Sequence, residues 1–346
     1  LSTGALLSCR LRVTVAEFVG EVTLSQFDVR LISKTTTKKP VSSHCPDCTS
    51  RTHEVTRWNF ITHALRLKSG EHDFPFSYLF PGHLPASCNG ELGQLEYFFV
   101  AHAQNTTGEE FSLKLPLNVS RVAVPGDDKS SICIFAHTNL TSYTVMPSVV
   151  SPNGKFPVKV VLSGVVDKGE EAQTRWRLRK AIWQIEECQK IVSTPCSKHE
   201  HKISRERKSI LYHATRFLGM GYYEDESGWT NNFDVEGGEI HIQFDANINS
   251  TIKPICDVEV PGGLEVSHNL VIQLLISEEF CPNDNTLLTT PTAKSRVLRM
   301  RFDLPVTEPS RRGMSWDEEI LPIYEDVAAN PPGYTRLDEG SSEGPN

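Results

Sequence analysis

Apolar and polar residues alternate with a period of two along most of this chain. Leu11, Val13 and Val15 alternate with arginine and threonine, and the pattern recurs at 239–244 and 298–302. Such alternation is typical of strands with one buried side and one solvent-facing side. The alternating runs are separated by turn-forming pairs, among them Pro81-Gly82, Asn89-Gly90, Pro125-Gly126 and Asn153-Gly154. Many short strands with frequent turns predict an all-β chain built from antiparallel β-sandwiches.

The chain has 346 residues, which is enough for two domains that each bury a core. Two strand-rich blocks, 1–138 and 154–305, are separated by a turn-rich stretch at 139–153, where we predict the hinge. Residues 306–346 lose the pattern and contain nine Asp/Glu, three Arg and no Lys, so we predict a disordered acidic tail. Because the first residue is Leu1 and lies just before an alternating run, we expect the first domain to be truncated at its N-terminus.

Cysteine usage indicates the compartment. The nine cysteines are an odd number and are scattered along the chain, which favours reduced thiols in the cytosol. Four N-x-[ST] sequons, at Asn105, Asn118, Asn139 and Asn249, leave an extracellular Ig-like module as an alternative. The apolar runs are only a few residues long, well below the roughly 20 residues that span a bilayer, so we predict no transmembrane segment.

Three segments carry a resemblance to a known family. Residues 70–87 with 93–97 resemble the arrestin N-domain signature, a glycine, an FPF-type strand, a turn bounded by prolines and a closing tyrosine strand. Residues 157–162 and 261–270 are similar to arrestin C-domain strands. Over roughly residues 1 to 305 the chain therefore resembles a fungal α-arrestin, an arrestin-related trafficking adaptor of the low-dye-binding type. The resemblance implies two antiparallel arrestin-like β-sandwich domains in tandem.

The alternation also predicts where the aromatic side chains of the FPF segment lie. Phe74, Phe76, Tyr78 and Phe80 fall on one side of an extended strand, so we expect them to fill a sandwich core.

The tail contains a PPxY motif, formed by Pro331, Pro332 and Tyr334. A WW domain binds a polyproline II turn in an aromatic groove and holds the tyrosine ring in a neighbouring pocket. In the family that this chain resembles, such tails bind HECT-type ubiquitin ligases of the Nedd4 class. A variant motif upstream, with Leu321, Pro322 and Tyr324, lacks the first proline and is expected to bind more weakly.

A basic segment lies between Arg175 and Lys208, where ten Lys/Arg face four Asp/Glu in a chain of net charge −8. Arginine and apolar residues alternate at 175–179, and a β-bulge near Lys180 is expected because the apolar side then changes. We predict a basic patch that binds anionic lipid headgroups or acidic cargo segments, with a solvated edge strand as the alternative. The predicted residues are Arg175, Arg177, Arg179, Lys180, Lys202, Arg205, Arg207 and Lys208.

A Cys-x2-Cys pair, Cys45 and Cys48, has the spacing of half a zinc site. A second Cys-x2-Cys is absent from the sequence, and the cluster of Cys196, His199 and His201 does not match the spacing of usual zinc fingers. We therefore predict a flexible loop, with no metal site and no cofactor. The sequence has no serine nucleophile elbow, phosphate-binding loop or paired-carboxylate signature, so we predict no catalytic residues.

The function that the resemblance implies is that of a non-enzymatic adaptor. Such a protein recruits a HECT-type ligase to cytosolic segments of plasma-membrane transporters and promotes their ubiquitination, endocytosis and sorting. We expect a cytoplasmic protein recruited peripherally to plasma membrane, endosomes or Golgi, with no nucleic-acid partner. A ligase-independent, retromer-like sorting scaffold of the same fold is the alternative.

Overall fold

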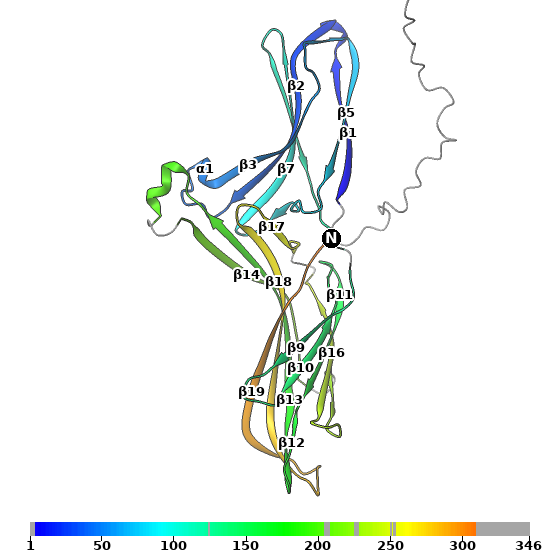
Figure 1. Ribbon diagram of the computed structural model, residues 1–346, viewed down its shortest axis with the longest axis vertical. Coiled ribbons are helices and arrows are strands. Elements are labelled where there is room, and N and C mark those ends of the chain that lie inside the picture. The colour runs from blue at the N-terminus through cyan, green and yellow to red at the C-terminus, as the bar shows by residue number, and fades with distance from the viewer. Residues whose placement is uncertain are drawn as a thin grey trace, which may run out of the picture. The chain divides into compact units, whose positions relative to one another are not determined.

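Antiparallel strands form nearly all of the regular secondary structure in the described part of the computed structural model (Figure 1), which confirms the predicted all-β class. The structure describes residues 4–123, 125–203, 208–224, 228–249, 251 and 254–308. They belong to one compact unit, Leu1–Pro309. Helices in this part of the chain are short, namely η1 (Glu17–Val19), α1 (Pro46–Thr49) and η2 (Ser197–Lys202). No helix among the described residues has the length and apolar character needed to cross a bilayer.

The first sandwich packs a two-stranded sheet on a six-stranded sheet. Strands β1 (Ala5–Val15) and β5 (Gly70–Phe80) pair along their full length. The larger sheet has the order β3-β2-β7-β6, with β4 paired to β2 and β8 paired to β7. Its strands are β2 (Glu21–Thr37), β3 (Ser50–Asn59), β4 (Leu65–Lys68), β6 (Cys88–Asn89), β7 (Gly93–Asn105) and β8 (Glu110–Leu117).

Aromatic side chains from β5 lie between these two sheets. Phe74, Phe76, Tyr78 and Phe80 are half-buried and pack against the core clusters of the sandwich. Phe74 meets a ring of β2 edge-to-face at 4.8 Å, and Phe76 lies 4.8 Å from the Trp58 ring of β3. Contacts of this kind add about 0.5–1.5 kcal/mol to the burial of the rings. The prediction that the FPF segment fills a sandwich core is confirmed.

The second sandwich consists of a five-stranded and a six-stranded sheet. The five-stranded sheet has the order β15 (Trp229–Asn232), β16 (Glu239–Asn247), β11 (Lys155–Ser163), β10 (Thr141–Met146), β9 (Lys129–Ile134). The other sheet contains β12 (Val166–Lys168), β13 (Ala172–Ser193), β14 (Ile210–Tyr223), β17 (Val258–Val260), β18 (Leu264–Pro282) and β19 (Thr290–Asp303). Alternate residues of these strands bury one apolar core between the sheets.

The strand pairing shows where the chain passes from the first sandwich to the second. The range 139–153, predicted as the hinge, contains β10, which pairs with β9 on one side and β11 on the other. The turn-rich residues there connect strands of one sheet, and the chain leaves the first sandwich between β8 and β9. At the other end of the body, Val306 is buried and bridges Val150, so the folded part continues past the predicted limit at 305.

Two long strands contribute to the cores of both sandwiches. Strand β13 places Leu178 and Ile185 in the core of the second sandwich and Ile191 in the core of the first. Strand β18 does the same with Leu270 and Leu264. The contact is close, because a Cβ added to Gly93 of β7 would lie 2.8 Å from the Ile191 side chain. The two sandwiches therefore share apolar burial across their junction (Figure 1).

A buried charge network lies where β13, β14 and β18 pass from one core to the other. The Glu187 carboxylate is fully buried and accepts hydrogen bonds from Arg216 at 2.7 Å, Gln189 at 2.7 Å and the Ile255 backbone N–H at 3.1 Å. His268, also fully buried, lies 3.5 Å from Glu187.

Hydrogen bonds decide the charge states of this network. Burial alone would raise the pKa of Glu187, but the hydrogen bonds from His268, Arg216, Ile255 and Gln189 lower that pKa to about 2. Burial would lower the pKa of His268, but its hydrogen bond to Asp257 at 2.5 Å and its contact with Glu187 raise it overall. Glu187 is therefore ionised at neutral pH, and the raised pKa of His268 favours its charged form.

We predict that the free energy of unfolding falls as pH rises above about 6.5, the ordinary pKa of histidine. A group whose pKa is higher in the folded than in the unfolded protein makes its full contribution to folding stability below the unfolded-state pKa. That contribution is lost as the pH rises through the folded-state pKa, and the pKa of His268 is raised in this way. His268→Gln should remove this part of the pH dependence and cost roughly 2–4 kcal/mol at pH 6, because two carboxylates lose a cation. Urea unfolding at several pH values provides the measurement. Parallel wild-type and variant curves would show that His268 is not charged in the folded state.

Candidate functional site

The ligase-binding motif predicted from the sequence lies outside the described residues. This holds for Pro331, Pro332 and Tyr334 and for the upstream Leu321, Pro322 and Tyr324. The last described residue is Glu308, two positions after the buried Val306.

The predicted β-bulge of the basic segment is confirmed. The register of β13 against β18 shifts between Leu178 and Lys180, so Arg179 is the extra residue of the bulge. The apolar side changes there as expected, because Leu178 before the bulge and Ala181 and Trp183 after it all face the core. The edge-strand alternative is wrong for Arg175, because β12 pairs with β13 at 173–175 on the side opposite β18, and β14 pairs with it from Ala181 onward. Between these two partners, Arg177, Arg179 and Lys180 have a described strand on one side only.

Neighbouring carboxylates partly neutralise the basic residues of β13. Arg179 donates to the buried Glu279 at 2.5 Å and to Ser277 at 2.7 Å, and Arg177 lies 4.0 Å from Glu279. Lys180 pairs with Glu224 at 2.5 Å, and both side chains are partly exposed. Arg179 is thus an internal counter-ion of Glu279, and only part of the local positive charge is available to a partner.

Arg175 is also engaged within the fold. Its guanidinium lies 4.9 Å from the Phe233 ring and donates to the Thr286 carbonyl at 3.5 Å.

The structure does not gather the whole predicted patch. Lys202 belongs to η2, beyond the far end of β13, and donates to Ser42 of the first sandwich at 3.1 Å. At a rise of about 3.3 Å per residue, the thirteen steps from Lys180 to Ser193 alone span about 43 Å. Lys208 is exposed, and Arg205 and Arg207 lie outside the described residues. The basic segment is therefore split between two ends of one strand.

Strand β19 adds two basic residues that the sequence analysis missed. Arg299 and Arg301 are 60% and 52% exposed at the side chain and approach Glu186 at 3.8 and 3.3 Å. Their alternation with the buried Leu298, Met300 and Phe302 was visible in the sequence, but the sequence could not place them beside β13.

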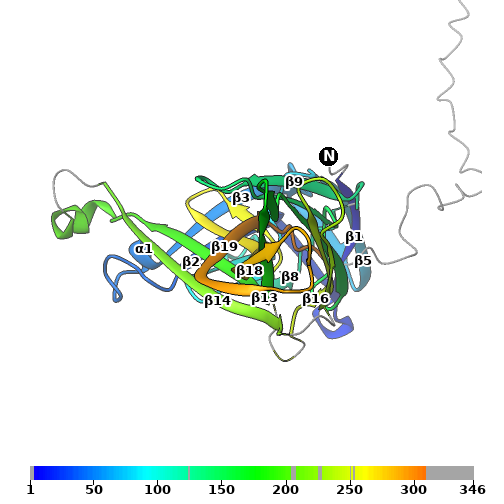
Figure 2. The ribbon, with the colours of Figure 1, turned by 90° about the horizontal axis from the view of Figure 1, so that it is seen from below.

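Cross-strand pairing arranges these residues on the face of the sheet that points away from the core. Residues paired across neighbouring strands lie on the same face of a sheet. One row runs Tyr222, Ile182, Gln273, Arg299, and the next runs Met220, Gln184, Val271, Arg301. Exposed apolar side chains of β14 thus lie on the same face as arginines of β19, and we call this surface the outer face of the C-terminal sheet. Figure 2 labels the strands β14, β13, β18 and β19 of this sheet.

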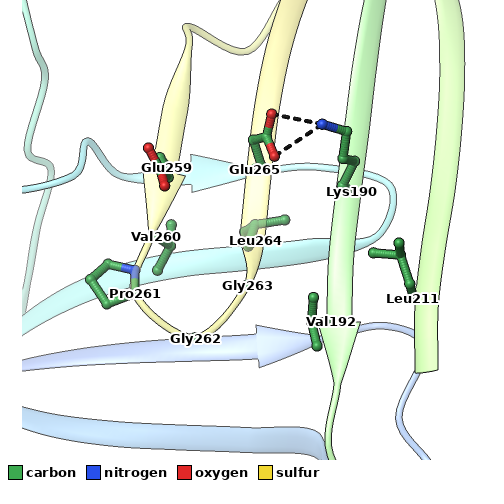
Figure 3. A pocket seen from close by; sticks show the side chains of 10 residues that line it. All are labelled: Lys190, Val192, Leu211, Glu259, Val260, Pro261, Gly262, Gly263, Leu264 and Glu265. Carbon is green, nitrogen blue, oxygen red and sulfur yellow. Dashed lines mark hydrogen bonds and ion pairs between the residues drawn. The ribbon is translucent and has the colours of Figure 1, made fainter. Parts of the chain in front are cut away.

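A pocket of about 380 Å³ opens at the other end of the same sheet, between β13, β14 and the β17–β18 turn (Figure 3). Its lining includes the apolar Val192, Leu211 and Leu264 and the ion pair of Lys190 with Glu265 at 2.9 Å. The lining contains no Ser, Cys or His, so this pocket offers no hydroxyl or thiol nucleophile and no imidazole base.

A cluster of soft ligands lies beside this pocket, where the loop before β3 meets η2 (Figures 1 and 2). Cys45, Cys48, Cys196 and His199 place one ligand atom each within 4.8 Å of one another. The Cys45 and Cys196 sulfurs are 3.7 Å apart, and the His199 Nδ1 lies 3.6 Å from the Cys48 sulfur and 3.1 Å from the Cys196 sulfur. The sequence analysis identified both halves of this cluster but treated them as unrelated.

Two antiparallel sandwiches in tandem define an arrestin-like protein. The chain belongs to the family described as LDB19, Arrestin_N terminal like, whose profile matches residues 27–203, about half of the chain. This finding confirms the resemblance drawn from the sequence.

The chain is also similar to individual proteins and solved structures. An uncharacterized protein of Schizosaccharomyces pombe is 32% identical over 99% of this chain and 86% of its own length. Protein LDB19 of Saccharomyces cerevisiae is 29% identical over 91% of this chain and 68% of its own. Squid arrestin matches with a TM-score of 0.42 and 9% identity, covering 88% of this chain and 100% of its own.

Proposed function

We propose that this protein is a non-enzymatic adaptor that brings a HECT-type ubiquitin ligase of the Nedd4 class to membrane transporters. The observation that carries the proposal is the PPxY motif at Pro331, Pro332 and Tyr334, which follows a body of the arrestin-like LDB19 family. The motif begins 23 positions beyond the last described residue, Glu308 (331 − 308). An unstructured chain of that length would have an end-to-end distance of roughly 25–29 Å.

The mechanism is an increase in effective concentration. One protein that binds both a ligase and its substrate turns their encounter into an intramolecular event, with effective concentrations up to about the millimolar range. The adaptor itself needs no reactive group, because the ligase performs the transfer of ubiquitin. The Tyr and Pro side chains of the motif supply the contacts that WW recognition uses.

The outer face of the C-terminal sheet is the surface that suits an acidic partner. It combines exposed Tyr222 and Met220 with Arg299, Arg301 and Lys180 in a chain whose net charge is −8. Positive groups with apolar side chains between them fit acidic cytosolic segments of transporters and the anionic headgroups of the membrane around them.

The free cysteines support the proposal that the protein acts in a reducing compartment. All nine are free in the structure, and three of them, Cys45, Cys48 and Cys88, lie buried in the first sandwich or its edge. This agrees with a cytoplasmic adaptor recruited to plasma membrane, endosomes or Golgi.

We predict that Tyr334→Ala weakens binding of a Nedd4-class WW domain to the full chain by more than about thirtyfold, because a pocket-filling aromatic side chain is lost. Tyr324→Ala is the matched control and should change binding only a few-fold, since its motif lacks the first proline. Titration calorimetry gives both dissociation constants. If Tyr334→Ala binds as well as the wild type, the ligase-independent sorting scaffold becomes the better account.

We predict that Lys180→Gln with Arg299→Gln weakens binding to phosphatidylserine vesicles and to an acidic transporter-tail peptide. At about 1 kcal/mol per charge near an anionic surface, the loss is tenfold to thirtyfold on vesicles. Arg179 and Arg301 stay in place to pair with Glu279 and Glu186, so the fold is preserved.

The control for this prediction is Lys155→Gln with Lys159→Gln, which removes two exposed charges from β11 in the opposite sheet. Vesicle sedimentation and peptide titration at low and high salt measure the effect. Equal losses in the two double variants would show that only net charge matters, and unchanged binding in both would remove the outer face from the mechanism.

A further inference from the structure

Two segments far apart in the chain meet at the cluster of Cys45, Cys48, Cys196 and His199. The first pair belongs to α1 and the residue before it, in the connection between β2 and β3 of the first sandwich. The second pair belongs to η2 and the residue before it, directly after β13 of the second sandwich. Facing partners in the two pairs are 151 positions apart. Soft ligands that are so far apart in the chain meet here because the fold holds both segments in place.

The distances fit one tetrahedral ion. With Zn–S of about 2.3 Å and Zn–N of about 2.0–2.1 Å, a regular tetrahedron has edges of about 3.8 Å between two sulfurs and about 3.5 Å between sulfur and nitrogen. Two observed edges match these values, 3.7 Å for Cys45 with Cys196 and 3.6 Å for Cys48 with His199. The edge between Cys196 and His199 is shorter, at 3.1 Å, and all four ligand atoms lie within 4.8 Å of one another. A disulfide requires about 2.05 Å between sulfurs, so the Cys45 and Cys196 sulfurs do not form one here.

The surroundings of the cluster support metal-bound thiolates. Cys45 and Cys48 are 8% and 5% exposed, so water has little access to their sulfurs. The Cys196 backbone N–H points at the Cys48 sulfur at 3.5 Å, a contact that stabilises a thiolate. Pro46 starts α1, whose single turn holds the two cysteines of the pair on one side.

Contacts around the cluster join the same two segments. Ser193 donates to the Lys39 carbonyl at 2.7 Å, Lys202 donates to Ser42 at 3.1 Å, and Lys198 lies 3.9 Å from Asp47. The two lysine contacts are exposed, so each contributes little stability by itself. A shared ion would join these two segments more strongly than either lysine contact does.

We propose that Cys45, Cys48, Cys196 and His199 bind one zinc ion that joins the β2–β3 connection of the first sandwich to η2 of the second. Three thiolates and one imidazole form a Cys3His set, the composition of closed structural zinc sites. Because all four positions are protein ligands, the ion has a structural role and leaves no open position for a substrate. The proposal revises the sequence-based prediction that the chain has no metal site, and it does not depend on the proposed adaptor function.

The test is the metal content of the full chain purified without chelators under reducing conditions. We expect one zinc per chain by inductively coupled plasma mass spectrometry. Cobalt exchanged into the protein should give the intense visible d–d bands of a tetrahedral thiolate site. A wild-type chain with no bound zinc and no such bands would overturn the proposal, and so would a Cys45–Cys196 disulfide found by mass spectrometry in the reduced preparation.

Variants identify the ligands. Cys48→Ser and Cys196→Ser should each lose the zinc, whereas Cys133→Ser on β9, a free cysteine outside the cluster, should retain it. His199→Cys keeps four soft ligands and should retain the ion with a changed cobalt spectrum, which separates a ligand role for His199 from a packing role. Full zinc content in Cys196→Ser would contradict the assignment, and the wild-type stoichiometry decides the matter even if a serine variant does not fold.

Discussion

The structure depends on two strands that run through both hydrophobic cores. Strands β13 and β18 pair with each other along most of their length, and each buries apolar side chains first in one core and then in the other. Burying Ile191 and Leu264 contributes roughly 1.5–3 kcal/mol per side chain. A change that separates the sandwiches would expose these residues and the charged network around Glu187. The junction is therefore part of the fold and differs from a flexible linker.

In the proposed adaptor function, this junction accounts for the division of roles between body and tail. A body whose domains share a core presents fixed surfaces, such as the outer face of the C-terminal sheet with Tyr222, Met220 and Arg299. Its long strands also bring η2 to the β2–β3 connection, where the zinc ligands meet. The PPxY motif lies beyond the body, where a short peptide can enter a WW groove without disturbing the sandwiches.

Much of this arrangement could be predicted from residues close together in the sequence. The alternation of apolar and polar residues predicted the strands, and the FPF segment predicted a strand face buried in a core. The change of apolar side at Lys180 predicted the β-bulge. Features that depend on tertiary contacts were missed. Arg299 lies on the outer face of the C-terminal sheet beside β13 only because β18 pairs with β19. Cys48 meets His199 only because β13 is long enough to reach the first sandwich. The turns around β10 resemble a linker in sequence, since a hairpin and a hinge use the same residues.

The most direct test of the account asks whether body and tail must be one molecule. A protease site inserted between Pro309 and Ser310 allows the chain to be cut after purification, with both pieces left in the reaction. Ubiquitin transfer to a reconstituted transporter by a Nedd4-class ligase is then measured with cut and uncut protein. Proximity predicts that cutting removes most of the stimulation, because the effective concentration supplied by the linkage is lost. Equal stimulation by cut and uncut protein would contradict the adaptor mechanism.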